Sequence, residues 1–209
     1  MKAKRKRSIL IAARYTSLVF TPFYLPLMGL AALFLFSYLS MMPWLYKGMV
    51  LLIVWIFTVF MPQMIIKLYH HYQGWSPLRL ITREGRIVPY AISIACYLWC
   101  YYFMISTLHT PHFMGAIIIA AIAIQILCAI INNWWKISTH TAAIGGTTGA
   151  VVAFGFIFYF NPFWWICLLL LLAGIVGTSR TLLRLHTLGE VTGGFLLGIF
   201  AGFTAVILT

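Results

Sequence analysis

The sequence has very few acidic residues: among its 209 residues, only Glu84 and Glu190 carry a side-chain carboxylate. Charged residues of both signs make up 8% of the chain, whereas they make up about a quarter of an ordinary soluble domain. Hydrophobic residues reach 63%. This balance excludes an ordinary soluble protein, and we expect residues 1–209 to form a single integral membrane domain with no room for a soluble partner domain.

Cysteine is also scarce, and the four present lie inside apolar stretches without any CxxC spacing: Cys96, Cys100, Cys128 and Cys167. A free cysteine in such surroundings usually behaves as a small hydrophobic residue. We therefore expect these residues to form neither a disulfide nor a metal site.

The formal net charge of +12 reflects both the lack of acids and a basic N-terminal segment, residues 1–16. Its cluster of lysines and arginines predicts contact with anionic membrane lipid, and we expect no nucleic-acid partner. Arg14 interrupts the apolar run that follows, and no small-residue cleavage site is present. We expect the segment to be retained rather than removed as a signal peptide.

Long apolar runs dominate the rest of the chain, and a membrane span needs about 20 such residues. Seven runs qualify: Ser17–Met41, Trp44–Leu68, Val88–Leu108, Phe113–Ile131, Thr141–Phe160, Phe163–Gly177 and about Val191–Leu208. Pro22 and Pro26 should kink the first run or make it re-entrant. The predicted fold is an all-α, polytopic membrane helix bundle with six or seven transmembrane helices.

Three polar segments separate these runs: Lys67–Pro89, Asn132–His140 and Thr178–Glu190. Two spans lie between each segment and the next, and an even number of crossings returns the chain to the same face. All three segments should therefore meet on one side of the membrane, where scattered polar groups can build a single site.

The third segment carries the sharpest signal, because Glu190 follows His186 by four residues and Arg180 and Arg184 lie nearby. On a helix, His186 and Glu190 would share a face and hydrogen-bond. A carboxylate that orients a histidine makes it a nucleophile or a base, and an arginine binds an anion. Two alternatives are a snorkelling arginine beside an interfacial ion pair and a zinc site formed by His140, His186 and Glu190.

The second segment has a base, a hydroxyl and a histidine within five residues: Lys136, Ser138 and His140. Ser138 or Thr139 is placed to cap the following helix, whose free N–H groups would then face a bound anion. A lone histidine at a membrane boundary is more often structural than catalytic.

In the first segment, Arg79, Arg83 and Arg86 recur at helical spacing. They would form either a phosphate-binding cationic face or an interfacial helix that grips lipid headgroups.

Taken in order, the three segments resemble the signature of the phosphatidic acid phosphatase type 2 superfamily, which includes the vanadium haloperoxidases. The family's first motif, Lys-x6-Arg-Pro, corresponds to Arg79-x6-Arg86, with Arg in place of Lys and the proline displaced to Pro89. Its second motif, Pro-Ser-Gly-His, corresponds to the sequence Ile-Ser-Thr-His at 137–140. The third, Ser-Arg-x5-His-x3-Asp, is matched throughout residues 179–190, with Glu in place of Asp. The motif region covers residues 79–190.

The resemblance implies a metal-independent, cofactor-free hydrolysis of a phosphomonoester or diphosphate through a phosphohistidine. It implies catalytic roles for His186, His140 and Glu190. Phosphate binding would fall to Arg79, Arg86, Ser138 and Arg180, with secondary contacts from Arg83, Lys136 and Arg184.

Because no soluble domain is present, we expect a lipid phosphate as substrate: phosphatidic acid, phosphatidylglycerol phosphate, undecaprenyl diphosphate or lipid A phosphate. The small size suggests an enzyme of the bacterial inner membrane. If two full spans precede Arg79, the basic N-terminus favours a site on the cytoplasmic side. The bacterial relatives favour the periplasmic side instead. We prefer the periplasmic side. The alternatives are a catalytically inactive relative that binds lipid phosphates or acts as a scaffold, and a small transporter.

Overall fold

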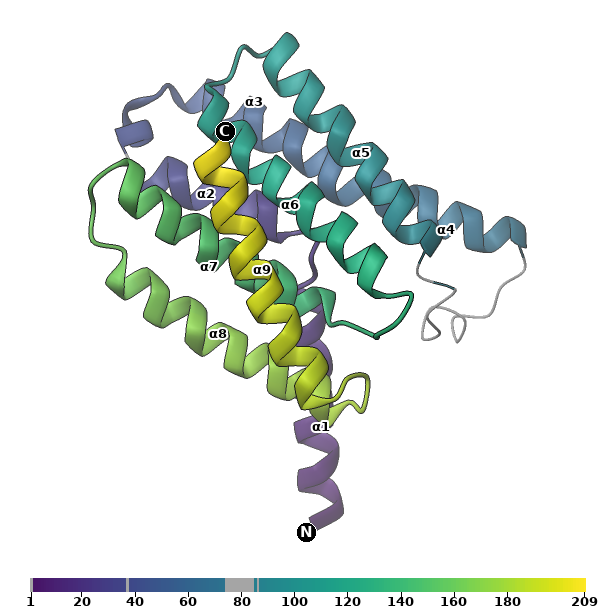
Figure 1. The fold of residues 1–209 in the computed structure, drawn as a ribbon. Coiled ribbons are helices and arrows are strands. Elements are labelled where there is room, and N and C mark those ends of the chain that lie inside the picture. Colours follow the sequence, from purple (N-terminus) through teal and green to yellow (C-terminus); the bar gives the residue numbers. More distant parts are fainter. Residues whose placement is uncertain (1, 37, 74–84, 86) are drawn as a thin grey trace.

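The computed structural model describes residues 2–36, 38–73, 85 and 87–209, and this part of the chain consists of helices and their connections, without a strand. In its first half the helices are α1 (Lys2–Val19), α2 (Leu25–Phe36), α3 (Trp44–Trp55), α4 (Met61–Gln73) and α5 (Ile87–Ser106). In its second half they are α6 (His112–Ile131), α7 (Thr139–Ile157), α8 (Phe163–Leu182) and α9 (Leu188–Leu208). Figure 1 shows how these elements pack into an all-α bundle.

Within the described residues, six helical stretches are long and apolar enough to cross a membrane: 44–72, 87–106, 112–131, 139–157, 163–182 and 188–208. They confirm six of the predicted spans, with boundaries that differ by a few residues. The first of them joins α3 to α4 through a π-helical turn, Ile56–Phe60. Pro62, the second residue of α4, has no backbone N–H to donate, which is a usual cause of such a local change in helical hydrogen bonding.

The remaining predicted span, Ser17–Met41, is two helices rather than one. α1 ends at Val19, and α2 begins at Leu25. Pro22 lies in the break; its ring disfavours helical backbone at the preceding residue, and it supplies no N–H to the helical ladder. A short 3₁₀ helix, Tyr38–Met41, then leads into α3.

The broken pair α1 and α2 passes from one end of the bundle to the other. Ser17 of α1 contacts Arg180 in the last turn of α8. Leu33 of α2 packs against the same buried cluster as Phe113 and Ile117, near the start of α6 at the opposite end. The N-terminus therefore lies at the end where α8 passes into α9, and the C-terminus lies at the other end (Figure 1).

Close packing of α7 against α9 forms the centre of the bundle and depends on glycine. A Cβ atom at Gly145 or Gly149 would collide with backbone carbonyls of α9. A Cβ atom at Gly198 or Gly202 would collide with backbone carbonyls of α7. The two backbones are in direct contact, as is usual where small residues repeat every four positions in membrane helices. This packing holds the first turns of the two helices together.

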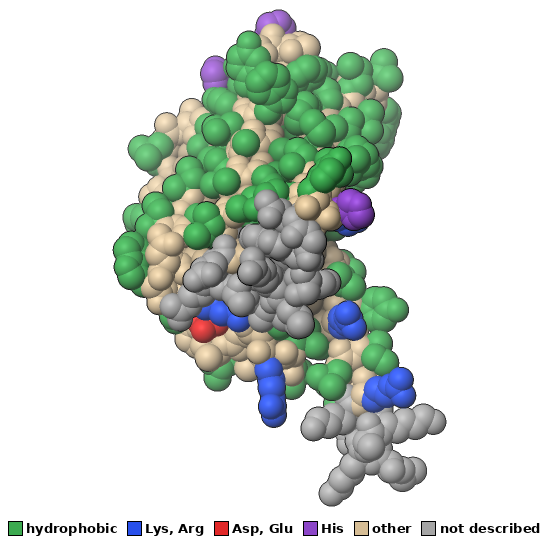
Figure 2. Space-filling model, turned by 90° about the vertical axis from the view of Figure 1, so that its right-hand side faces the viewer, with side chains coloured by type: hydrophobic (Ala, Val, Ile, Leu, Met, Phe, Trp, Pro, Cys, Tyr) green, Lys and Arg blue, Asp and Glu red, His purple; other side chains and the backbone are tan. Residues whose placement is uncertain are grey.

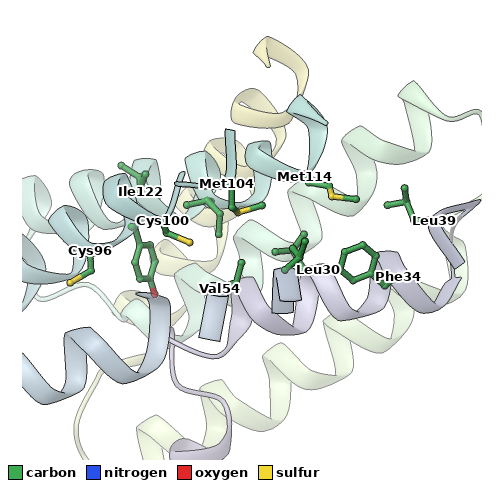
Figure 3. Close-up of a cluster of buried hydrophobic side chains, with 12 residues drawn as sticks. Leu30, Phe34, Leu39, Val54, Cys96, Cys100, Met104, Met114 and Ile122 are labelled. Atoms are coloured by element: carbon green, nitrogen blue, oxygen red, sulfur yellow. The ribbon is translucent and has the colours of Figure 1, made fainter. Parts of the chain in front are cut away.

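A hydrophobic cluster joins α2, α3, α5 and α6 on the other side of the bundle (Figure 3). Leu30, Val54, Cys100 and Met104 are among its fully or almost fully buried members. The outer surface is also apolar: Figure 2 shows hydrophobic side chains over the upper part of one face, with Lys and Arg side chains and a carboxylate lower down, toward α1. Such an exposed apolar surface is suited to contact with lipid.

Candidate active site

His186, in the connection between α8 and α9, forms a largely buried pair with Glu190 in the first turn of α9. The Nδ1 atom of His186 lies 2.8 Å from Oε2 of Glu190. The His186 side chain is 1% exposed and that of Glu190 is 14% exposed. Since a carboxylate accepts hydrogen bonds, Nδ1 donates, and in neutral histidine the Nε2 atom then carries the ring lone pair. The contact predicted from their spacing is confirmed.

The pair is not formed on one continuous helix, and that part of the prediction is wrong. α8 ends at Leu182 and α9 begins at Leu188, so His186 lies in the connection. Thr187 is the N-cap of α9: its hydroxyl accepts from the Glu190 N–H at 3.3 Å, and the Glu190 carboxylate accepts from the Thr187 N–H at 3.4 Å. This reciprocal capping box turns the carboxylate back toward His186.

The end of α8 has a backbone conformation that is unusual for its sequence. The N–H of Arg184 donates to the Thr181 carbonyl at 2.9 Å, and the N–H of Leu185 donates to the Arg180 carbonyl at 3.1 Å. These two bonds define a Schellman motif, in which the residue with positive φ is usually glycine. Here it is Arg184, with φ 53°. The motif reverses the chain directly after Arg180 and directs it toward His186.

Ser138 connects the first turn of α7 to the pair formed by His186 and Glu190. Its N–H donates to the Glu190 carbonyl at 3.2 Å. It occupies the predicted N-cap position, but its side chain makes no capping hydrogen bond. Ser138 is fully buried, and its Oγ atom has no hydrogen-bond partner within the described ranges. A buried hydroxyl of this kind at a helix N-terminus can donate to a bound anion.

Gly194 allows this close approach of α7 and α9. A Cβ atom at Gly194 would lie 2.6 Å from the Ser138 carbonyl oxygen and 2.8 Å from the Thr141 hydroxyl oxygen. That hydroxyl donates to the same Ser138 carbonyl at 3.1 Å. A side chain at position 194 would therefore push the Ser138 backbone away from Glu190.

Arg180 is held by the N-terminal helix. Its Nη1 atom donates to the Ser17 hydroxyl at 2.7 Å, and Ser17 is buried. Sequence reasoning missed Ser17, because a single serine in an apolar helix carries no signal for a contact 163 positions away. It also missed the role of Thr187, although the pattern Thr-x-x-Glu before an apolar run is a recognisable capping box.

The other predicted site residues take different positions. His140 lies in the first turn of α7, half-buried, and lines a cavity together with Arg180. Lys136 is half-buried before α7, and Arg184 is exposed. Arg79, Arg83 and Arg86 lie outside the described residues. The connections before α7 and before α9 meet at one end of the bundle, as the count of spans predicted.

No cluster of three or more histidine, cysteine or acidic side chains suited to a metal ion occurs in the part of the chain that the structure describes. His140, His186 and Glu190 all belong to this part, so the zinc interpretation has no geometric support. The four cysteines are free thiols, with Cys167 exposed and the others buried.

No family model, curated protein or solved structure matches this chain.

Proposed function

We propose that the chain is a membrane-embedded, metal-independent lipid phosphate phosphatase of the phosphatidic acid phosphatase type 2 superfamily. The observation that carries the proposal is the buried pair of His186 and Glu190, hydrogen-bonded at 2.8 Å. It lies beside the N-terminus of α7, where the Ser138 N–H donates to the Glu190 carbonyl. A paired nucleophile candidate, a helix N-terminus and a nearby arginine are the components that phosphoryl transfer needs.

In the first step, Nε2 of His186 attacks phosphorus and forms the P–N bond while the bond to the leaving oxygen breaks. Glu190 accepts the hydrogen bond from Nδ1 and stabilises the positive charge that develops on the ring. His140 gives its proton to the leaving oxygen, which departs as the lipid alcohol or, from a diphosphate, as the lipid monophosphate.

In the second step, His140 removes a proton from water, and the resulting hydroxide attacks phosphorus. The P–N bond breaks, inorganic phosphate leaves, and neutral His186 is restored. Arg79, Arg86, Arg180 and the Ser138 hydroxyl hold the phosphate oxygens in both steps, with Arg83, Lys136 and Arg184 as secondary contacts. In such reactions, positioning and charge stabilisation supply most of the rate enhancement.

The surroundings of the site support a substrate that is itself a membrane lipid. The bundle is apolar on its outside, and the site lies at one end of six apolar helices. We expect a phosphate or diphosphate on a membrane lipid, drawn from phosphatidic acid, phosphatidylglycerol phosphate, undecaprenyl diphosphate and lipid A phosphate.

We place the protein in a bacterial inner membrane, with the site facing the cytoplasm. The resemblance favours the periplasmic side, but the broken pair α1 and α2 brings the basic N-terminus to the same end as the connection that holds His186. Among the Lys and Arg residues in the described part of the chain, Lys47 alone belongs by chain order to the opposite half. Cytoplasmic faces carry the excess of Lys and Arg.

A reporter at the C-terminus tests this orientation, because that terminus lies at the end opposite the site. Alkaline phosphatase fused after Thr209 should be active, since it folds in the periplasm, and green fluorescent protein at the same place should be dark. The reverse pattern would place the site in the periplasm.

Phosphate release tests the activity itself. Purified protein in detergent is given the four lipid phosphates in the presence of EDTA, beside His186→Ala. The proposal predicts release by the wild type alone. If neither folded protein releases phosphate from any of the lipids, the alternative of a catalytically inactive lipid-binding relative is favoured instead.

A further inference from the structure

A cavity of about 730 Å³ runs through the bundle between α2, α5, α6, α7 and α8. Along α7 it is lined from His140 to Phe154, and along α8 from Trp165 to Arg180. At 1.5 Å per residue, each of these stretches is about 21 to 23 Å long. The cavity therefore begins beside two predicted site residues and extends most of the way toward the opposite end.

The cavity is polar at one end and lined mainly by apolar side chains along the rest of its length. His140 and Arg180 lie at the site end, whereas most of the remaining lining is aliphatic or aromatic, from residues such as Phe20, Leu169 and Phe154. An apolar cavity of this size is a poor site for water or ions, since they would lack hydrogen-bond partners. The length and the apolar lining of the cavity suit a hydrocarbon chain.

The cavity also reaches the side of the bundle. Met28 of α2 and Leu168 of α8 both line it, and they are 44% and 47% exposed. α2 packs mainly against α3, α6 and α7, and α8 packs mainly against α1, α7 and α9. The cavity thus has an opening between α2 and α8, bordered by side chains that would face lipid in a membrane.

We propose that this cavity binds one hydrocarbon chain of the substrate, which enters sideways from the bilayer between α2 and α8, with the phosphate at the end lined by His140 and Arg180. The inference rests on the proposed phosphatase activity and deepens it. A chain that fills about 21 Å would reach beyond the middle of a hydrocarbon core that is about 30 Å thick. The site should therefore favour long chains.

Turnover of two single-chain substrates, hexadecyl phosphate and butyl phosphate, tests this inference. Each buried methylene strengthens binding about fourfold at most, so wild type should have a much higher kcat/KM for hexadecyl phosphate. Leu168→Trp places a larger side chain in the opening, and Met28→Trp does so from the other side. Each should lower the ratio of the two kcat/KM values about tenfold or more.

Leu171→Trp is the matched control, because Leu171 is 60% exposed on the same helix and does not line the cavity. Its ratio should equal that of the wild type. If Leu168→Trp and Met28→Trp also keep the wild-type ratio, the lateral opening between α2 and α8 is wrong.

Binding of hexadecyl phosphonate, which cannot be hydrolysed, separates this inference from the activity. Native mass spectrometry should detect it on wild type and on Leu171→Trp, and much less of it on Leu168→Trp. This pattern without any phosphate release would support the cavity and refute the phosphatase. Phosphate release with equal phosphonate binding by all three proteins would support the phosphatase and refute the cavity.

Discussion

Gly194→Ala is the substitution that most directly tests how the site is held together. The new Cβ atom would lie 2.6 Å from the Ser138 carbonyl oxygen. The backbone there must move by about 0.8 Å to reach an ordinary contact of 3.4 Å. The hydrogen bond from the Ser138 N–H to the Glu190 carbonyl is already 3.2 Å long. A shift of this size takes it outside hydrogen-bonding range.

Two opposing effects set the change in stability. Crowding in a well-packed interior costs about 1 to 3 kcal/mol. Replacing glycine by alanine within a helix stabilises it by about 0.5 to 1 kcal/mol. The net expectation for Gly194→Ala is a loss of about 0.5 to 2 kcal/mol. Activity should fall further, because a displacement approaching 1 Å in a catalytic constellation can cost up to about 100-fold.

Gly174→Ala is the matched control, since a Cβ atom at Gly174 of α8 meets no other atom within 4 Å. This variant should be slightly more stable than the wild type and fully active. Thermal unfolding in detergent and phosphate release are measured for all three proteins. If Gly194→Ala unfolds at the same temperature as Gly174→Ala and keeps wild-type activity, the coupling between Ser138 and Glu190 does not support the site.

Three further substitutions test single contacts. Glu190→Gln keeps a capping residue at the third position of α9 but removes the negative charge beside His186. Phosphate release should fall by about 10²–10⁴-fold, with little change in the temperature of thermal unfolding. Activity equal to that of the wild type would remove Glu190 from the mechanism. Ser17→Ala removes the acceptor for Arg180 and should raise KM by about tenfold at most with kcat nearly unchanged, whereas Ser17→Thr, which keeps the hydroxyl, should restore KM. Arg184→Gly relieves the positive φ at the end of α8 and should increase stability by about 1 to 2 kcal/mol; Arg184→Ala, which keeps the Cβ atom, should give no such gain in a melting experiment.

Much of the fold could be predicted from the sequence, because membrane spans need long apolar runs and short polar connections. The run Phe113–Ile131 differs from α6 by a single residue at its start. Pro22 correctly marked the first run as irregular, but its position alone does not distinguish a re-entrant loop from a broken crossing. That distinction depends on where α2 packs, which is a tertiary property.

The site was predictable to a lesser degree. The spacing of His186 and Glu190 indicated their contact, although the contact arises from a capping box centred on Thr187 rather than from a continuous helix. The contact of Ser17 with Arg180 and the cavity beside His140 depend on how distant helices pack. No local pattern in the sequence encodes either of them.

The proposed mechanism requires His186 to become covalently phosphorylated during turnover, and this intermediate can be trapped. The protein is mixed with hexadecyl phosphate in EDTA, quenched in alkali, digested and analysed by mass spectrometry. The proposed mechanism predicts an acid-labile phosphate on His186 that is absent from His186→Ala. Phosphate release without any phosphorylation of His186, or with equal release by His186→Ala, would contradict it.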